Sequence, residues 1–128
     1  MGLDMYLERK KRNVEADAEN AWEEVMYWRK ANQIREWFVN NLLDVVENCK
    51  RTPVYLSDLE ELVETCETVL ADHSKAKELL PTSSGFFFGG TEYDEWYYQD
   101  LEETVEGLKR VIEETDWETE DVAYFEWW

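Results

Sequence analysis

The side chains best suited to bind a ligand are concentrated between residues 28 and 40. Five polar side chains recur there at the spacing of one helix face: Arg29, Asn32, Gln33, Glu36 and Asn40. A planar guanidinium and carboxamides make directed hydrogen bonds, which suit a planar or phosphorylated ligand. Trp28 and Trp37 flank the face and can stack on a ring. The alternative is that Arg29 and the amides tie the helix to loop carbonyls and to acids on a later helix.

A second candidate is the segment GFFFGG at residues 85–90. A Gly-rich loop before a helix can hold an anion on free backbone N–H groups. Against this, the segment lacks a P-loop lysine, and Glu92, Asp94 and Glu95 already occupy the positive end of the following helix. We expect the loop to fold its Phe side chains over the core or to present one as a lid. The predicted ligand-binding residues are Trp28, Arg29, Asn32, Gln33, Glu36, Trp37, Phe87, Tyr93 and Trp96.

Motifs for catalysis or metal binding are absent from the sequence. There is no HExxH or GxSxG, and His73 is the single histidine. Cys49 and Cys66 lack the spacing of metal ligands, and the acids of residues 94–100 do not match a calcium-binding loop. We therefore expect a protein that is not an enzyme and that uses no metal and no cofactor.

The chain of 128 residues carries a net charge of −18, which opposes direct binding of nucleic acid and of anionic membranes. Residues 92–128 hold fourteen acids and two bases, and therefore most of the excess charge. A hydrophobic fraction of 44% is sufficient for one domain with its own core. The first residues contain no apolar segment of the signal-peptide type, and no run reaches the length of a membrane span, so we expect a cytoplasmic protein with reduced thiols.

Hydrophobic periodicity predicts six elements along the chain. They are a strand over residues 3–8, a long helix from about residue 20 to 46, a short strand over 52–56, a helix over 57–73, a helix from residue 91 to an acidic link at 116–121, and a strand over 122–128. Ser57 with Glu60, and Thr91 with Asp94, are typical of helix starts. We expect the first and last strands to pair, because lone strands would leave backbone groups unpaired. The predicted fold is a single α+β domain, residues 1–128, with three main helices packed on a small antiparallel sheet formed by the N- and C-terminal strands.

Four segments carry a resemblance to a known family. They are MGLDMYL at residues 1–7, YWRKANQI at 27–34, GFFFG at 85–89 and YDEWYYQDL at 93–101. In this order they resemble a family of small, uncharacterised phage and prophage proteins over nearly the whole chain. The carboxyl end departs from that family, which has small polar residues where this chain has Phe125, Glu126 and Trp127. The resemblance implies a phage or prophage origin and hence the cytoplasm of the host cell, and it supplies no catalytic residues.

These observations leave two main functions open. The first is an accessory binding protein that sequesters a host small molecule such as a nucleotide signal, as a counter-defence protein would. The second is an acidic mimic of nucleic acid that blocks a host nucleic-acid-binding protein. A hollow lined by Arg29, Asn32, Gln33 and Trp28 favours the first, and rows of carboxylates along a convex face favour the second. A small enzyme is disfavoured, and the sequence leaves homo-oligomerisation open.

The charge distribution predicts how stability responds to salt. Self-repulsion within residues 92–128 destabilises the fold at low ionic strength, and added salt screens it. The melting temperature should therefore rise between about 10 mM and a few hundred mM sodium chloride, as measured by circular dichroism. A flat or falling trend would mean that bases elsewhere in the fold already neutralise these acids.

Overall fold

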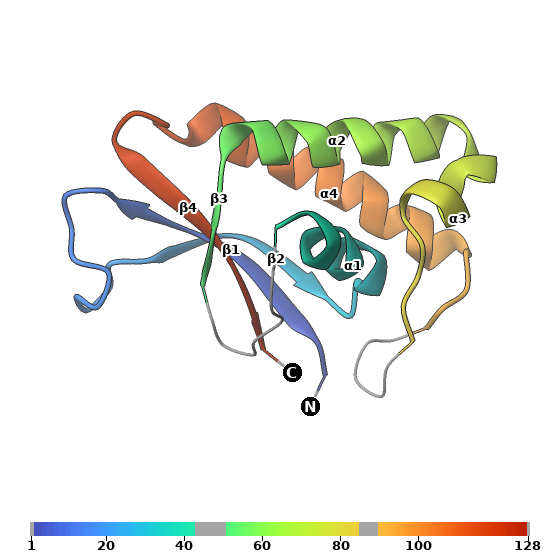
Figure 1. The fold of residues 1–128 in the computed structure, drawn as a ribbon, viewed down its shortest axis with the longest axis horizontal. Coiled ribbons are helices and arrows are strands. Elements are labelled where there is room, and N and C mark those ends of the chain that lie inside the picture. The colour runs from blue at the N-terminus through green and yellow to red at the C-terminus, as the bar shows by residue number, and fades with distance from the viewer. Residues whose placement is uncertain (1, 43–50, 85–89, 128) are drawn as a thin grey trace.

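The computed structural model describes residues 2–42, 51–84 and 90–127. Within them the strands are β1 (Asp4–Lys11), β2 (Glu23–Arg29), β3 (Thr52–Val54) and β4 (Glu120–Trp127). The helices are α1 (Asn32–Asn41), α2 (Leu56–Ala71), the 3₁₀ turn η1 (His73–Lys75), α3 (Ala76–Leu79) and α4 (Glu95–Glu114). The fold is α+β, as the sequence predicted (Figure 1).

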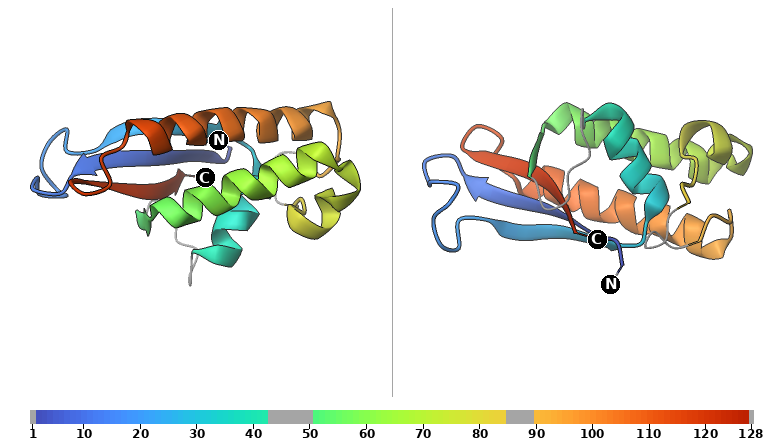
Figure 2. Two further views of the ribbon diagram at one scale, coloured as in Figure 1. Left: turned by 90° about the horizontal axis from the view of Figure 1, so that it is seen from above. Right: turned by 60° about the horizontal axis from the view of Figure 1, so that its bottom comes forward.

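The four strands form one antiparallel sheet in the order β2-β1-β4-β3. The predicted pairing of the two terminal strands is confirmed, and it runs over eight residue pairs from Asp4 opposite Trp127 to Lys11 opposite Glu120. β1 and β4 are therefore the central strands, and β3 is a short edge strand. The two long helices, α2 and α4, lie side by side and run in opposite directions (Figures 1 and 2).

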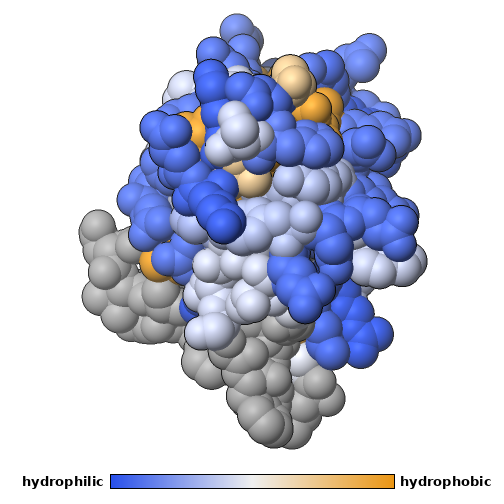
Figure 3. All heavy atoms as spheres, turned by 90° about the vertical axis from the view of Figure 1, so that its right-hand side faces the viewer, coloured by the Kyte–Doolittle hydropathy of each residue, from blue (hydrophilic) through white to orange (hydrophobic). Residues whose placement is uncertain are grey.

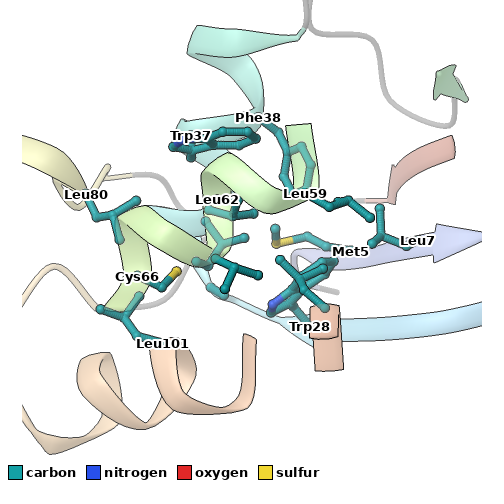
Figure 4. Packing of buried hydrophobic residues seen from close by; sticks show 14 of the residues in the cluster. Met5, Leu7, Trp28, Trp37, Phe38, Leu59, Leu62, Cys66, Leu80 and Leu101 are labelled. Carbon is teal, nitrogen blue, oxygen red and sulfur yellow. The ribbon is translucent and has the colours of Figure 1, made fainter. Parts of the chain in front are cut away.

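The hydrophobic core lies between the sheet and the helices. On β1, Met5 and Leu7 point into it, while Tyr6 between them points to the outer face of the sheet. Figure 4 shows Met5, Leu7 and Trp28 packed with Leu59 and other side chains from α2 and α4. Complete burial of each such side chain contributes roughly 1.5–3 kcal/mol to folding, so the alternation on β1 is sufficient to fix which face it buries.

The predicted long helix over residues 20–46 is wrong. Glu23–Arg29 forms strand β2, the chain turns at Lys30, and α1 begins only at Asn32. Trp28 points into the core, where its indole N–H donates to Thr104 Oγ1 at 2.8 Å, while Tyr27 lies on the opposite face. Aromatic and β-branched residues suit a strand as well as a helix, and pairing with β1 decides between them. Residues 43–46 of the predicted helix lie outside the described residues.

The two predicted helix starts are displaced by a few residues. α2 begins at Leu56, and the Asp58 carboxylate accepts a hydrogen bond from the Tyr55 N–H at 2.9 Å, so Ser57 is not the cap. α4 begins at Glu95, and Asp94 rather than Thr91 caps it by accepting from the Tyr97 N–H at 3.1 Å. In each case an acidic side chain satisfies an N–H group at the helix start.

Gly107 lies in the middle of α4 and faces strand β2. A Cβ atom added there would overlap the sulfur of Met26 on β2. Glycine inside a helix costs about 1 kcal/mol relative to alanine, and the space that a side chain at Gly107 would need is occupied here by the end of the flexible Met26 side chain.

We predict that the effect of Gly107→Ala depends on Met26. In the natural chain the added methyl displaces the Met26 side chain, which cancels or reverses the gain in helix propensity. In a Met26→Ala background the obstacle is gone, and Gly107→Ala should stabilise the fold by about 1 kcal/mol. Urea denaturation of the four proteins measures the coupling, and an identical effect in both backgrounds would rule out the contact.

Candidate functional site

A hollow of about 550 Å³ lies where the end of β2, the start of α1 and the start of α4 meet. We call it the Arg29 hollow, and the side chains that matter to its chemistry are Arg29, Lys30, Asn32, Gln33, Trp96 and Asp100. Figure 3 faces the end of the molecule that carries α3 and the start of α4, and the described surface there is mostly hydrophilic, with small apolar patches. A ligand at this end therefore meets polar groups more than apolar ones.

Two of the predicted binding residues are structural ties. Asn32 Nδ2 donates to the Gly90 carbonyl at 2.7 Å, and Asn32 Oδ1 accepts from the Ser83 N–H at 2.9 Å. Gln33 Nε2 lies 3.4 Å from the Tyr97 carbonyl and 3.3 Å from Asp100 Oδ2. Both amides are buried, so they hold α1 against the neighbouring loop and α4. Asn32 and Gln33 therefore follow the alternative interpretation, in which the amides tie the helix to loop carbonyls and to an acid on a later helix.

Arg29 and Lys30 remain available to a ligand. Both are exposed at the rim of the Arg29 hollow, and neither side chain makes a hydrogen bond or ion pair within the described part of the chain. Lys30 has a φ of 56°, a left-handed conformation that is strained for any residue with a Cβ. Its backbone is held there because the Lys30 N–H donates to the Leu3 carbonyl at 2.7 Å.

The predicted aromatic residues divide between the core and the hollow. Trp28 and Trp37 are buried in the core and cannot stack on a ligand, which corrects the prediction for both. The Tyr93 hydroxyl accepts from the Thr82 N–H at 3.2 Å, and its ring is half-buried. Trp96 is 64% exposed and lines the hollow, so it is the one predicted ring in the described chain that is free to stack.

The remaining predicted residues do not join this group. Glu36 is half-buried on α1 and does not line the hollow. Phe87 lies outside the described residues. The predicted residues are not brought together because their spacing was interpreted as one continuous helix from Arg29 onward. In the structure the chain turns between β2 and α1 instead.

Asp100 is an acid of the Arg29 hollow whose pKa is clearly raised. Burial raises the pKa of its carboxyl to about 6; the hydrogen bond from Gln33 opposes this rise, and the nearby charges of Glu103 and Asp94 add to it. Asp100 is therefore partly protonated just below neutral pH and can donate as well as accept hydrogen bonds. The sequence had singled it out only as one of the acids of residues 94–100, which do not match a calcium-binding loop.

A second hollow, of about 370 Å³, lies beside β3 and the start of β4, and sequence reasoning did not predict it. We call it the Arg51 hollow; it is lined by Lys10, Arg12, Trp22, Arg51, Tyr55 and Trp117, among others. The basic cluster at residues 9–12 was the only signal in this region. Its bases balance acids on neighbouring strands, for example Arg12 against Asp121 at 3.0 Å.

The side chains that could serve in catalysis or metal binding are not arranged for either role in the part of the chain that the structure describes. Burial raises the pKa of the Cys66 thiol to about 12, so Cys66 stays protonated and is a poor nucleophile. His73 stacks on Tyr98 at 3.7 Å. Over residues 2–42, 51–84 and 90–127, no cluster of three His, Cys, Asp or Glu side chains is suited to hold a metal ion, and no helix is long and apolar enough to span a bilayer.

Comparison with known protein families finds no match, and comparisons with curated proteins and with solved structures find none either. The evidence for a function therefore comes from the geometry of the two hollows.

We predict that Asp100→Asn stabilises the protein at neutral pH and not in acid. Because the folded-state pKa of about 6 lies above the ordinary value near 4, the folded protein holds this proton more tightly than the unfolded chain does. The resulting stability is complete below about pH 4 and is lost as the pH rises through about 6. Asparagine stays neutral, so its advantage should grow to about 1 kcal/mol at pH 7, a figure reduced for screening by the open hollow.

Chemical denaturation from pH 4 to 7 measures the difference between the variant and the natural chain. The matched control is Glu113→Gln, an exposed acid near the end of α4 whose charge is not among those that raise the Asp100 pKa, and it should show no such trend. A difference for Asp100→Asn that is constant with pH would contradict the raised pKa.

Proposed function

We propose that this protein binds a small molecule that carries an anionic group and a planar ring, such as a nucleotide, in the Arg29 hollow. One observation carries the proposal: two bases without partners in the described chain, Arg29 and Lys30, stand at the rim of a hollow that also holds an exposed indole and a half-buried carboxyl. Hollows of about 300–1,000 Å³ with a few convergent polar groups are typical of small-molecule sites.

Each group has a distinct part in such binding. The Arg29 guanidinium can make two parallel hydrogen bonds to a phosphate or carboxylate, and Lys30 adds a second positive charge. Trp96, exposed at the start of α4, offers a face on which a ring can stack. Asp100, deeper in the hollow, presents a carboxyl to polar groups on the ring edge, and the hydrogen bond from Gln33 holds that carboxyl in place.

The strain at Lys30 supports the proposal. A residue with a Cβ at φ 56° costs about 1 kcal/mol or more where glycine would cost little. Glycine would relieve the strain and lose only the side chain, so the retained lysine is consistent with a use for its ammonium group.

Electrostatics restrict an anion to few places on this chain. At a net charge of −18 the surface repels anions except where bases outnumber acids locally. Arg35 on α1 is buried and paired with Glu126 at 2.9 Å, so it does not face the solvent. The Arg29 hollow is lined by two bases, Arg29 and Lys30, and three acids, Glu92, Asp94 and Asp100, so an anion is favoured only at the rim where the two bases stand together.

The biological setting of the proposal comes from the resemblance to phage and prophage proteins. We place the protein as a phage accessory factor that sequesters a host signal in the host cytoplasm, in the manner of a counter-defence protein. An acidic mimic of nucleic acid is the second candidate, because the outward sides of α2 and α4 carry rows of exposed glutamates: Glu60, Glu61, Glu64 and Glu67 on α2, and Glu102, Glu103, Glu106, Glu113 and Glu114 on α4.

The test is the loss of ligand binding in Arg29→Ala. A thermal-shift screen of nucleotides identifies a ligand, and calorimetry then compares the natural chain with the variant. Arg29→Ala should weaken binding by about 2 kcal/mol or more, because a charge-assisted bond pair is lost. Lys30→Gly should weaken binding while it raises the melting temperature, because the backbone strain is relieved.

The matched control is Arg110→Ala, which removes an exposed base on α4 whose only partner in the described chain is Glu106. It should leave ligand binding unchanged. Glu102, Glu106 and Glu113 changed together to Gln should also leave it unchanged, whereas the mimic function predicts that this triple variant loses a host protein partner. Unfolding of Arg29→Ala would show that Arg29 is a structural tie and would remove the proposed site.

A further inference from the structure

The Arg51 hollow contains a guanidinium that is already fixed in position. Arg51 Nε donates to Glu8 Oε1 at 2.9 Å, and its guanidinium carbon lies 4.9 Å from the Trp22 ring centroid and 5.5 Å from that of Phe125. One ion pair and two rings therefore hold the group, which reduces the entropy lost when it binds a ligand.

The two terminal nitrogens of Arg51 remain unused within the described part of the chain. Its hydrogen bonds there involve Nε alone, and 42% of the side chain is exposed. The other bases of the hollow differ, because Arg12 donates to Asp121 and to three backbone carbonyls, and Lys10 donates to the carbonyls of Lys11 and Val14. Arg51 is thus the base in this hollow that can offer a two-pronged donor to an incoming anion.

The rest of the hollow suits a ring. Its walls include the side chains of Trp22, Tyr55 and Trp117, together with the apolar residues Pro53 and Val122. Tyr55 is 66% exposed, so its ring is open to a ligand in the hollow. The volume of about 370 Å³ is near the lower limit for small-molecule sites, so it suits a ligand with one ring system.

Local charge also permits an anion here. The residues that line the hollow include three bases, Lys10, Arg12 and Arg51, and two acids, Glu120 and Asp121. Even with Glu8 counted as the partner of Arg51, this neighbourhood is neutral in a chain of net charge −18. An anion approaching this hollow therefore meets less repulsion than on the glutamate-covered helices.

We infer that the Arg51 hollow is a second ligand site, specific for a small aromatic ring that bears a carboxylate or phosphate, with the anion on Arg51 and the ring among Trp22, Tyr55 and Trp117. The site shares no residue with the Arg29 hollow and stands independently of the proposed function.

The experiment uses the full-length, ¹⁵N-labelled protein and follows the indole N–H signals of its seven tryptophans by NMR. Trp22, Trp96 and Trp117 are assigned with single Trp→Phe variants. The probes are phenyl phosphate and benzoate, with inorganic phosphate and phenol as the anion-only and ring-only controls. The Trp22 and Trp117 signals should shift saturably with phenyl phosphate or benzoate and respond at least about tenfold more weakly to either control, since each control lacks one of the two groups.

Two variants test the assignment to this hollow. Arg51→Gln should weaken binding of the ring-bearing anion by about tenfold or more, and Tyr55→Ala should weaken it severalfold. Arg29→Ala, in the other hollow, should leave the Trp22 and Trp117 shifts unchanged. Because the Tyr55 side chain is largely exposed, Tyr55→Ala decides the matter even if Arg51→Gln lowers the melting temperature.

Three results would overturn the inference. They are the absence of a saturable shift of Trp22 and Trp117 at millimolar probe, unchanged affinity in both variants, and equal binding of inorganic phosphate. The last would mean a site for simple anions without ring recognition. A shift of Trp96 instead of Trp22 and Trp117 would place the probe in the Arg29 hollow, which would support the proposed function and reject this second site.

Discussion

A single buried ion pair determines where α1 sits, and with it much of the candidate site. Arg35 Nε on α1 meets Glu126 Oε2 on β4 at 2.9 Å, and the Tyr124 hydroxyl donates to Glu126 Oε1 at 3.1 Å. Removing one partner of such a pair typically costs about 3–5 kcal/mol, because the other charge is left uncompensated away from water. Phe38, one turn along α1, stacks on Tyr124 at 4.1 Å. The ion pair and this ring contact together tie α1, and so Asn32 at the Arg29 hollow, to the central strand.

Charged side chains are unevenly distributed over the fold, and the two hollows lie far apart on it. Glutamates cover the outward sides of α2 and α4, while on the sheet Arg9 is paired with Glu23 and Glu120, and Lys10 with Asp121. The two hollows lie toward opposite ends of β1, since Arg29 pairs with Asp4 and Lys10 lines the Arg51 hollow. An eight-residue strand spans roughly 25 Å, so ligands at the two sites would not touch.

How far the sequence predicts this structure depends on the range of the interactions. The alternation in residues 3–8 and 122–128 and the periodicity of α2 and α4 are local signals, and they predicted the paired terminal strands and the α+β fold. The error over residues 20–31 arose because the same residues suit a helix or a strand until β1 is beside them. Asn32 was misinterpreted because its partners, Ser83 and Gly90, are remote in sequence. The Arg51 hollow was missed for the same reason, since separate segments must fold together to form it.

The order of the strands places a constraint on synthesis. β4 comes last of the four strands along the chain, yet it lies in the middle of the sheet, between β1 and β3. Until β4 has left the ribosome, β1 and β2 can form only an isolated hairpin, β3 has no strand beside it, and Arg35 has no Glu126. Isolated hairpins are marginally stable in water. The nascent chain therefore keeps one edge of β1 unpaired until β4 has emerged, and the many glutamates on α2 and α4 would help to keep that intermediate soluble.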